Sequence, residues 1–484
     1  MNRSKTGEEL DGALDTWILN KRRELIEDIK TLVRIPSISA APNGKYPFGE
    51  PCGAVVDSME GLIRKHGLGV KSYDYYGIGA LYGKDTAERL SSNSIGFFSH
   101  LDVVPPGDGW TGSPFEGREQ DGFIIGRGAT DNKGPAVAVL YTLKFLQDQG
   151  IVLKHGLYAF FGCNEEAGMQ DIAHFLEVDN PPAFGLVSDS SFPVCNGEKG
   201  ILTADFVANL GEGNLVRFEG GTVSNMVPNY ASVELRGIGA EEARAVLGSD
   251  FTVEALEGSG QPGGALVRIS ARGISGHAAF PENSVNALQK LAAGILKANL
   301  AQGDAVPALT FVADSFADYY GEGLNIAFED ELSGKTTHVG STGATREGKL
   351  IIGINVRYAI TSPQEELVER LRQRGAAYGY TLEKIHNRPP CYTPADDPLV
   401  IALNDIANRH LGTDLKPFVM GGGTHARRLP RAVGYGPERR DIPSPFGPLE
   451  GKAHQVNEAV SVASLEEAIH IYVQAILKLD ELLS

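Results

Sequence analysis

The stretch SIGFFSHLD, residues 94–102, places six small or apolar residues directly before a histidine and an aspartate. Such a run, without polar alternation, is typical of a strand buried on both faces of a sheet. The same pattern recurs twice: GLYAFFG (156–162) is followed by CNEE, and FGLVS (184–188) is followed by Asp189. The sequence therefore predicts three buried strands, each ending directly before side chains that can bind a metal ion.

The segments around these strands have helical character. Pro135 begins a predicted helix over 136–146, at a position where its missing N–H costs nothing. An apolar stripe predicts another helix over 10–32, and an amphipathic pattern predicts a third over 464–483. Strands that alternate with helices predict an α/β fold with a mostly parallel sheet covered by helices.

The character of the chain changes after about Gly197. Three later segments alternate apolar and polar residues, as strands with one exposed face do; they are 231–236, 251–256 and 265–271. A helix over 284–300, a strand over 350–360 and helices over 363–378 and 396–410 are also predicted. We expect a discontinuous first domain, residues 1–197 and 390–484, with an α+β domain of antiparallel strands, residues 198–389, inserted into it.

Composition excludes several classes of protein. The chain has 484 residues with 44 Lys and Arg against 61 Asp and Glu, a net charge of −17, and no basic cluster that would suit nucleic acid. We find no apolar run of about 20 residues that could cross a membrane, and the N-terminal segment does not resemble a secretory signal. The four cysteines have no CxxC spacing, which argues against a disulfide scaffold and a thiolate zinc site; they are Cys52, Cys163, Cys195 and Cys391. We expect a cytoplasmic enzyme with no nucleic-acid or membrane partner.

The acids and the histidine that follow the strands should meet at one edge of the sheet, where open α/β sheets place their ligand sites. A further acid, Asp131, lies in the glycine-rich turn 126–134. Taken singly, each residue has a structural alternative as an N-cap, a turn former, a solvated acid or a core histidine. Together, the carboxylates would repel one another unless a cation lay among them. Histidine and carboxylates without cysteine favour zinc, with manganese or cobalt as alternatives.

Residues beside the candidate ligands have natural supporting roles. Asp102, two residues beyond His100, can hydrogen-bond the far ring nitrogen of that histidine and so fix its orientation. Consecutive Glu165 and Glu166 cannot point the same way on an extended backbone. One of them can bind metal while the other faces the reacting water.

Seven stretches together resemble a known family. SHLDVVPPGDGW, GRGATDNKG, NEEAG and SDSSFP are similar to the di-metal aminoacylase/carboxypeptidase superfamily, which includes acetylornithine deacetylase, succinyl-diaminopimelate desuccinylase and carnosinase. GISGHAAFP and GGGTHAR, together with NGEKG, are more narrowly similar to peptidase V-type dipeptidases. The resemblance runs from about Glu27 to the final predicted helix, and the ordered set of motifs is highly specific.

The resemblance implies a role for each matching residue. It implies two divalent metal ions, bound by His100, Asp131, Glu166, Asp189 and His454. Asp131 would bridge the two ions and precede a cis peptide bond. Glu165 would be the general base that takes the proton of a water activated by the two ions, and Asp102 would support His100.

The inserted domain would supply the remaining groups. On sequence alone, His277 is a turn histidine or a helix-start residue; the resemblance implies instead that it stabilises the oxyanion of the tetrahedral intermediate. Peptidase V-type enzymes supply this histidine from an enlarged lid on the same chain, so the site would be complete in a monomer, with a homodimer as the alternative. The resemblance also implies that the substrate is bound by Asn225, Arg357, Gly422, Gly423 and Thr424.

Two features depart from the family pattern near the predicted carboxylate-binding loop. His425 stands where tyrosine is more usual, and the segment 438–452 is longer and richer in proline. The function we expect is a metal-dependent dipeptidase that acts on dipeptides or short peptides with a free C-terminal carboxylate. The alternatives are an N-acyl amino-acid deacylase with the same metals and a non-catalytic peptide-binding protein, and the presence of Glu165 weighs against the latter.

Overall fold

The computed structural model describes residues 7–83, 90, 92–256, 265–439, 441–447 and 450–483. The chain forms two compact units. Unit 1 comprises residues 1–197, 393–418 and 424–484, and unit 2 comprises residues 198–392 and 419–423.

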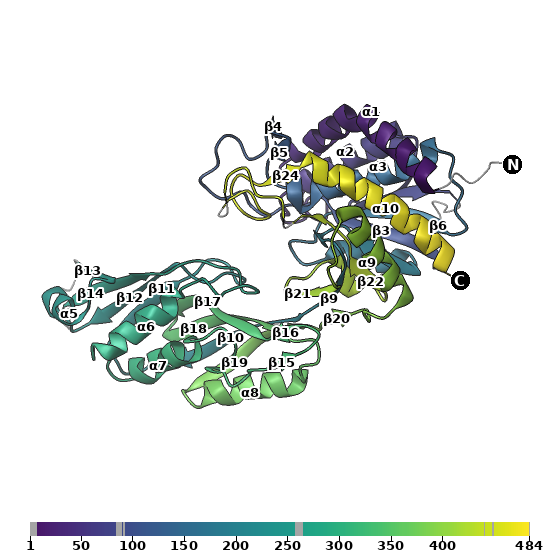
Figure 1. Ribbon diagram of the computed structural model, residues 1–484. Helices are drawn as coiled ribbons and strands as arrows, with labels where there is room; N and C mark the ends of the chain where they lie inside the picture. The colour runs from purple at the N-terminus through teal and green to yellow at the C-terminus, as the bar shows by residue number, and fades with distance from the viewer. Residues whose placement is uncertain are drawn as a thin grey trace. The chain divides into compact units, whose positions relative to one another are not determined.

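Unit 1 is an α/β unit built on a mixed sheet with the strand order β1-β2-β6-β3-β7-β22-β9 (Figure 1). Its strands are β1 (Gly69–Ser72), β2 (Gly77–Tyr82), β3 (Ser94–His100), β6 (Gly156–Gly162), β7 (Phe184–Val187), β22 (Ala432–Gly434) and β9 (Cys195–Glu198). Its helices are α1 (Gly7–Val33), α2 (Glu50–Lys65), α3 (Gly134–Asp148), α4 (Gln170–Val178), α9 (Pro398–Leu411) and α10 (Val462–Leu482). The smaller elements are β4 (Arg118–Gln120), β5 (Phe123–Ile125), η1 (Ala129–Lys133), β8 (Ser190–Ser191), η2 (His425–Arg428), β23 (Pro437–Glu438) and β24 (Ala459–Ser461).

The centre of this sheet is parallel. Strand β3 pairs in parallel with both β6 and β7, and β7 pairs in parallel with β22. Strands β1 and β2 are antiparallel to their neighbours and extend one side of the sheet. The predicted α/β class is therefore confirmed, and the antiparallel edge is an addition that the sequence analysis did not foresee.

Both faces of the sheet are covered, as the apolar strand runs predicted. In β3, Phe97 packs into the large core formed with α1, α2, α3 and α10, whereas Phe98 packs into a second core on the other face. The same alternation occurs in β6, where Phe161 belongs to the large core and Phe160 to the second. All seven residues of β3 and of β6 are buried.

Unit 2 is an α+β unit with an eight-stranded sheet of order β13-β14-β12-β11-β17-β18-β10-β19, in which every pairing is antiparallel. The strands are β10 (Gly200–Asn209), β11 (Leu215–Gly220), β12 (Tyr230–Arg236), β13 (Phe251–Ala255), β14 (Leu266–Arg272), β17 (Thr337–Arg346), β18 (Lys349–Tyr358) and β19 (Tyr380–Arg388). The helices are α5 (Ala240–Val246), α6 (Ala287–Lys297), α7 (Ala305–Ser315) and α8 (Gln364–Ala376). The remaining strands are β15 (Glu329–Asp330), β16 (Gly334–Lys335), β20 (Cys391–Tyr392) and β21 (Phe418–Met420).

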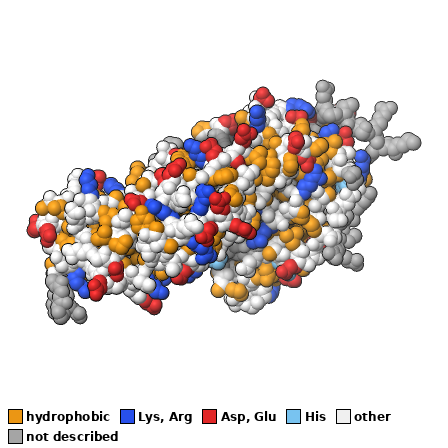
Figure 2. All heavy atoms as spheres, turned by 90° about the horizontal axis from the view of Figure 1, so that it is seen from below, with side chains coloured by type: hydrophobic (Ala, Val, Ile, Leu, Met, Phe, Trp, Pro, Cys, Tyr) orange, Lys and Arg blue, Asp and Glu red, His pale blue; other side chains and the backbone are white. Residues whose placement is uncertain are grey.

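The helices of unit 2 lie along one face of its sheet (Figure 1). Alternate residues of β12 and β14 are buried, and the apolar ones pack with α6 and α7 in a single core. This alternation was the basis on which the sequence predicted strands with one exposed face. No helix in the described part of the chain is both long and apolar enough to span a membrane. On the face drawn in Figure 2, acidic and basic side chains are interspersed rather than gathered by sign.

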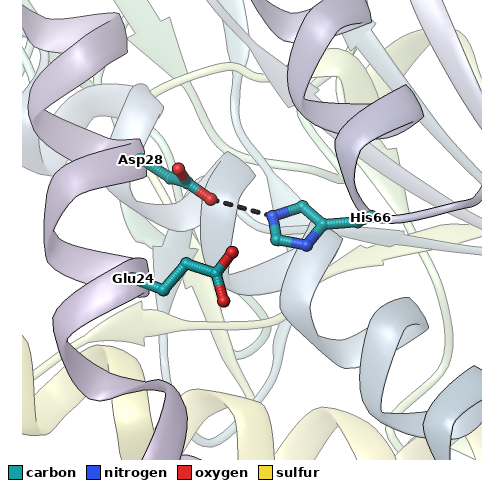
Figure 3. Close-up of side chains that lie close together, drawn as sticks. All are labelled: Glu24, Asp28 and His66. Carbon is teal, nitrogen blue, oxygen red and sulfur yellow. Dashed lines mark hydrogen bonds and ion pairs between the residues drawn. The ribbon is translucent and has the colours of Figure 1, made fainter.

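A buried polar cluster holds α1, α2 and α3 together. Glu24 and Asp28 lie one turn apart on α1 and face His66 at the end of α2 (Figure 3). Asp28 accepts hydrogen bonds from His66 (2.8 Å), Lys65 (2.7 Å) and the Tyr141 hydroxyl (2.9 Å). Although these groups have the chemistry of metal ligands, Lys65 already supplies the positive charge, and it also contacts Glu24 at 3.1 Å. We interpret the cluster as structural.

Substitution of Asp28 tests this role. Burial by itself would raise the pKa of Asp28, but the hydrogen bonds from His66, Lys65 and Tyr141 hold it below its ordinary value. Because the folded-state pKa is the lower one, the stabilisation is complete above the unfolded-state pKa and is lost as the pH falls through the folded-state pKa. We expect Asp28→Asn to destabilise the protein by about 3 to 5 kcal/mol at pH 7, measured as a lower urea midpoint, with a smaller difference from wild type at pH 3.

The control is Glu60→Gln, which removes an exposed ion pair with Arg64 on α2. Its effect should stay below about 1 kcal/mol. A destabilisation by Asp28→Asn no larger than that of the control would contradict the assignment.

Candidate metal centre

Three neighbouring parallel strands deliver three of the five candidate ligands, His100, Glu166 and Asp189. The order β6-β3-β7 places their carboxyl ends side by side, since His100 at the end of β3 pairs with Gly162 at the end of β6, and Phe98 pairs with Val187 at the end of β7. The residues that follow β6 and β7 therefore arrive at the same edge as His100. This is the convergence that the sequence analysis predicted.

Asp131 lies between two histidines that are far apart in the sequence. Its Oδ1 is 2.8 Å from Nε2 of His100, and its Oδ2 is 3.0 Å from Nε2 of His454. The turn η1 carries Asp131 into this position directly before α3, and the peptide bond from Asp131 to Asn132 is cis, as expected. Each carboxylate oxygen of Asp131 thus faces a different histidine.

The remaining carboxylates divide between the two histidines. Oε1 of Glu166 is 2.8 Å from Nε2 of His454, and Oδ2 of Asp189 is 3.8 Å from Nε2 of His100. The structure therefore brings all five predicted ligands together. His100, Asp131 and Glu166 offer ligand atoms within 4.8 Å of one another, and so do His100, Glu165 and Asp189.

Crowding and burial shift the pKa values of these acids and of the histidines beside them. Burial, together with the charge of Asp131, raises the pKa of Asp189 to about 8 and also raises the pKa of Glu166. Burial would likewise raise the pKa of Asp131, but the hydrogen bonds from His100 and His454 hold it far below its ordinary value. For His454, hydrogen bonds to Asp131 and Glu166 outweigh burial and raise the pKa to about 11. In the protein alone, the two histidines supply the positive charge that these acids require.

Glu165 lies in the same group as His100 and Asp189. It is buried, and burial with the charges of Asp189, Glu166 and Asp102 raises its pKa well above the ordinary value despite the opposing charge of His100. Within the described residues, Oε1 of Glu165 has no hydrogen-bond partner. Such a buried, unpaired carboxylate oxygen is costly, and divalent cations with a bound water would satisfy it. The two histidines and the carboxylates around them, together with the unbonded Oε1 of Glu165, fit a pair of divalent metal ions.

Asp102 has a broader role than the one expected of it. Its two carboxylate oxygens accept the backbone N–H groups of Glu165 and Glu166, each at 3.1 Å. The nearer contact to Nδ1 of His100 is the Asp102 carbonyl at 3.0 Å, while Oδ1 lies at 3.5 Å. Asp102 therefore orients His100 and the two glutamates at once.

Asn132 is a residue that the sequence analysis missed. Its side-chain amide donates to the Ser188 carbonyl (2.7 Å) and to Oδ1 of Asp189 (3.3 Å). The amide thereby ties the Asp131 turn to the end of β7. Its position directly after Asp131 was the available signal.

In unit 2, two segments bring His277 close to Asn225. His277 pairs with Met226 in an isolated bridge, and the Asn225 carbonyl accepts the N–H of Ala278 at 2.8 Å. Nδ1 of His277 accepts the N–H of Ala279 at 3.2 Å. A neutral His277 ring with Nδ1 as acceptor carries its proton on Nε2, which can then donate.

Arg357 and the glycine loop also meet in unit 2. Arg357 is buried on β18; its Nε donates to Oδ1 of Asn355 (2.8 Å), and its guanidinium donates to the Gly421 carbonyl (2.8 Å). Arg357 thereby holds the loop that contains Gly422 and Gly423. Thr424, assigned to unit 1, is buried, and its hydroxyl accepts the N–H of Ala426 as a cap for η2.

The two departures from the family pattern have different outcomes. His425 is buried in unit 1, with Nε2 at 3.1 Å from Oδ2 of Asp171, which also accepts the N–H of Asn164 beside the glutamate pair. The segment 438–452 is only partly described, because Arg440, Pro448 and Leu449 lie outside the described residues.

Comparison with known sequences gives consistent matches. A model of the Peptidase family M20/M25/M40 matches residues 96–478. The Bacillus subtilis (strain 168) protein named "Putative dipeptidase YtjP" is 31% identical over 478 residues, covering 96% of this chain and 98% of the relative. A "Putative dipeptidase" of Staphylococcus epidermidis (strain ATCC 12228 / FDA PCI 1200) is 30% identical over 476 residues, covering 95% of this chain and 97% of the relative.

Solved structures show the same fold. Human carnosine dipeptidase 1 matches with a TM-score of 0.57 at 15% identity, over 98% of this chain and 99% of its own. The di-peptidase Dug1p of Saccharomyces cerevisiae matches with a TM-score of 0.56 at 14% identity, over 97% and 98%. The family match spans most of the chain, and the relatives match over nearly their whole length. The chain therefore belongs to the Peptidase family M20/M25/M40, a family of metallopeptidases.

Proposed function

We propose that this enzyme is a dipeptidase that uses two divalent metal ions to hydrolyse dipeptides or short peptides with a free C-terminal carboxylate. The observation that carries the proposal is the placement of Asp131, whose two oxygens face two different histidines, each beside a further carboxylate. One ion would be held by His100, Asp131 and Asp189, and the other by Asp131, Glu166 and His454. The names of the sequence relatives support the dipeptide substrate.

Zinc suits this set of ligands best, with manganese or cobalt as alternatives. When bound, the ions would lower the pKa of a shared water toward neutrality and polarise the substrate carbonyl. Glu165 takes a proton from the attacking water and returns it to the leaving amine. Asp102 holds the backbone of Glu165 through its N–H and thereby keeps the base in place.

Unit 2 has the role of a lid in this proposal. Nε2 of His277 donates a hydrogen bond to the oxyanion of the tetrahedral intermediate. Asn225 and Arg357 bind the substrate, and the N–H groups of Gly422 and Gly423, with Thr424, bind its C-terminal carboxylate. The contact of Arg357 with the Gly421 carbonyl supports a joint role for this strand and this loop.

The setting of the enzyme follows from the same features. The four cysteines lack CxxC spacing, which argues against a disulfide scaffold and suits a reducing compartment such as the cytoplasm. We propose that the chain acts in the cytoplasm as a monomer that contains both the metal centre and its lid.

A substrate panel tests the proposal. The Zn²⁺-loaded protein is assayed with dipeptides, a tripeptide, N-acetyl amino acids and N-succinyl amino acids, before and after treatment with a chelator. We expect hydrolysis of the dipeptides, its loss on chelation, and its recovery with Zn²⁺, Mn²⁺ or Co²⁺. Preference for the N-acyl amino acids would establish a deacylase instead. Activity that is indifferent to the chelator would refute the metal mechanism.

Glu165→Gln tests the general base. Because the variant has a side chain of the same size without a basic oxygen, we expect kcat to fall by about 10²- to 10⁴-fold, while the protein still binds two Zn²⁺ ions. The measurements are steady-state kinetics and metal content by mass spectrometry. The exposed Glu177→Gln on α4 is the matched control. Wild-type turnover in Glu165→Gln would remove Glu165 from the mechanism.

His277→Ala tests the donor in unit 2. Loss of one hydrogen bond to the oxyanion should lower kcat by about 10²- to 10³-fold, with unchanged metal content because His277 is not a proposed ligand. His386→Ala, on β19 in the same unit, is the control. If His277→Ala lost metal but kept the kcat of its metal-loaded fraction, the proposed role would be wrong.

A further inference from the structure

Arg127 and Glu458 form a buried ion pair that the mechanism above does not use. Arg127 is 1% exposed and Glu458 is 0% exposed, although they are 331 residues apart in the sequence. Both belong to unit 1. Arg127 follows β5, and Glu458 directly precedes β24, which pairs antiparallel with β5.

Glu458 contacts the backbone of the turn that carries Asp131. Its Oε1 accepts the N–H groups of Thr130 (2.9 Å) and Asp131 (3.0 Å), while its Oε2 accepts from the Arg127 guanidinium. The Thr130 hydroxyl adds a further bond to the Ala459 carbonyl (2.9 Å). The turn is thus bound to the segment around Glu458 through both its backbone and a side chain.

Arg127 contacts the backbone of His454. Its second terminal nitrogen donates to the His454 carbonyl and to the Pro106 carbonyl, each at 3.2 Å, and its guanidinium carbon lies 5.4 Å from the Trp110 ring centroid. His454 has a φ of 64°, in the left-handed region that non-glycine residues rarely adopt. A hydrogen bond to its carbonyl helps to hold this backbone conformation and therefore the direction of the imidazole.

The ion pair of Arg127 and Glu458 is not explained by a contribution to stability alone. A buried ion pair repays its desolvation only when every polar group is satisfied. In the described part of the chain, Nε of Arg127 is buried without a hydrogen-bond partner. What the pair does achieve is a rigid connection between two backbone segments, one carrying Asp131 and the other carrying His454.

We propose that Arg127 and Glu458 are positioning residues of the metal centre: Glu458 fixes the backbone of Asp131, and Arg127 fixes that of His454. This inference rests on the proposed two-metal function. Because Asp131 serves both ions, loss of Glu458 weakens both sites. Because His454 serves one ion, an altered Arg127 weakens mainly that site.

Zn²⁺ titration of the apoprotein by calorimetry tests this assignment with no reference to activity. We expect Glu458→Ala to weaken both bound Zn²⁺ ions by about 10- to 100-fold, the range found for residues that support metal ligands. Arg127→Lys keeps the buried charge, but an ammonium cannot reproduce the forked contacts of the guanidinium. We expect it to weaken one ion and to leave the other at wild-type affinity.

Asp179→Asn is the matched control. Asp179 forms a buried ion pair with Lys71 on the edge strand β1 (2.8 Å), outside the contacts of the metal centre. This variant should lower the melting temperature of the apoprotein and leave both Zn²⁺ affinities unchanged. If Asp179→Asn weakened Zn²⁺ as much as Glu458→Ala, the effect would be general destabilisation and the positioning role would be overturned.

The wild type separates this inference from the function on which it rests. A wild-type protein that binds fewer than two Zn²⁺ ions would overturn the metal centre and the positioning role together. A wild type that binds two ions, with both affinities retained in Glu458→Ala and Arg127→Lys, would overturn the positioning role alone. If Glu458→Ala does not fold, the Zn²⁺ titration of Arg127→Lys still tests the positioning role.

Discussion

Several carboxylates share one buried edge of a sheet, and their mutual repulsion is the constraint on which unit 1 depends. Burial and the charge of Asp131 raise the pKa values of Glu166 and Asp189, and positive charge among the three acids makes the arrangement tolerable. His100 and His454 supply that charge in the protein alone. The same geometry that is unfavourable for bare acids is favourable for divalent cations. The apolar cores on both faces of the sheet hold the strands in register despite the repulsion among these carboxylates.

Several residues around the candidate ligands fix the positions of those ligands. Asp102 orients three groups at once, Asn132 joins the Asp131 turn to the end of β7, and the pair of Arg127 and Glu458 joins that turn to the segment of His454. None of these contacts needs to touch a substrate. They restrict where the ligands can lie, which the proposed pair of closely spaced cations would require.

Much of this was readable from sequence because the signals are local. The strands 94–100 and 156–162 are uninterrupted apolar runs, and the chemistry-bearing residues follow them directly, so one rule about parallel sheets predicts their convergence. His454 has no such signal: it lies in an irregular segment 288 residues from Glu166, and only the family resemblance indicated it. Strand β17 was missed because its sequence, THVGSTGATR, is polar and glycine-rich, and its pairing with β18 and β11 determines its structure. The contacts of Asp102 with the N–H groups of Glu165 and Glu166 could not be predicted either, since they depend on the backbone conformation after β6.

The discontinuity of unit 1 has a consequence for how the protein is made. Strand β22 pairs with β7 and β24 pairs with β5, so both pairings join early residues to residues beyond 430. Nearly all of unit 2, by contrast, is one continuous stretch, residues 198–392. During translation the inserted unit can therefore condense while the flanking one still lacks strands of its sheet. The nascent first segment must keep its apolar strands from aggregating until the ribosome has delivered the rest, and its acids acquire His454 only at that late moment.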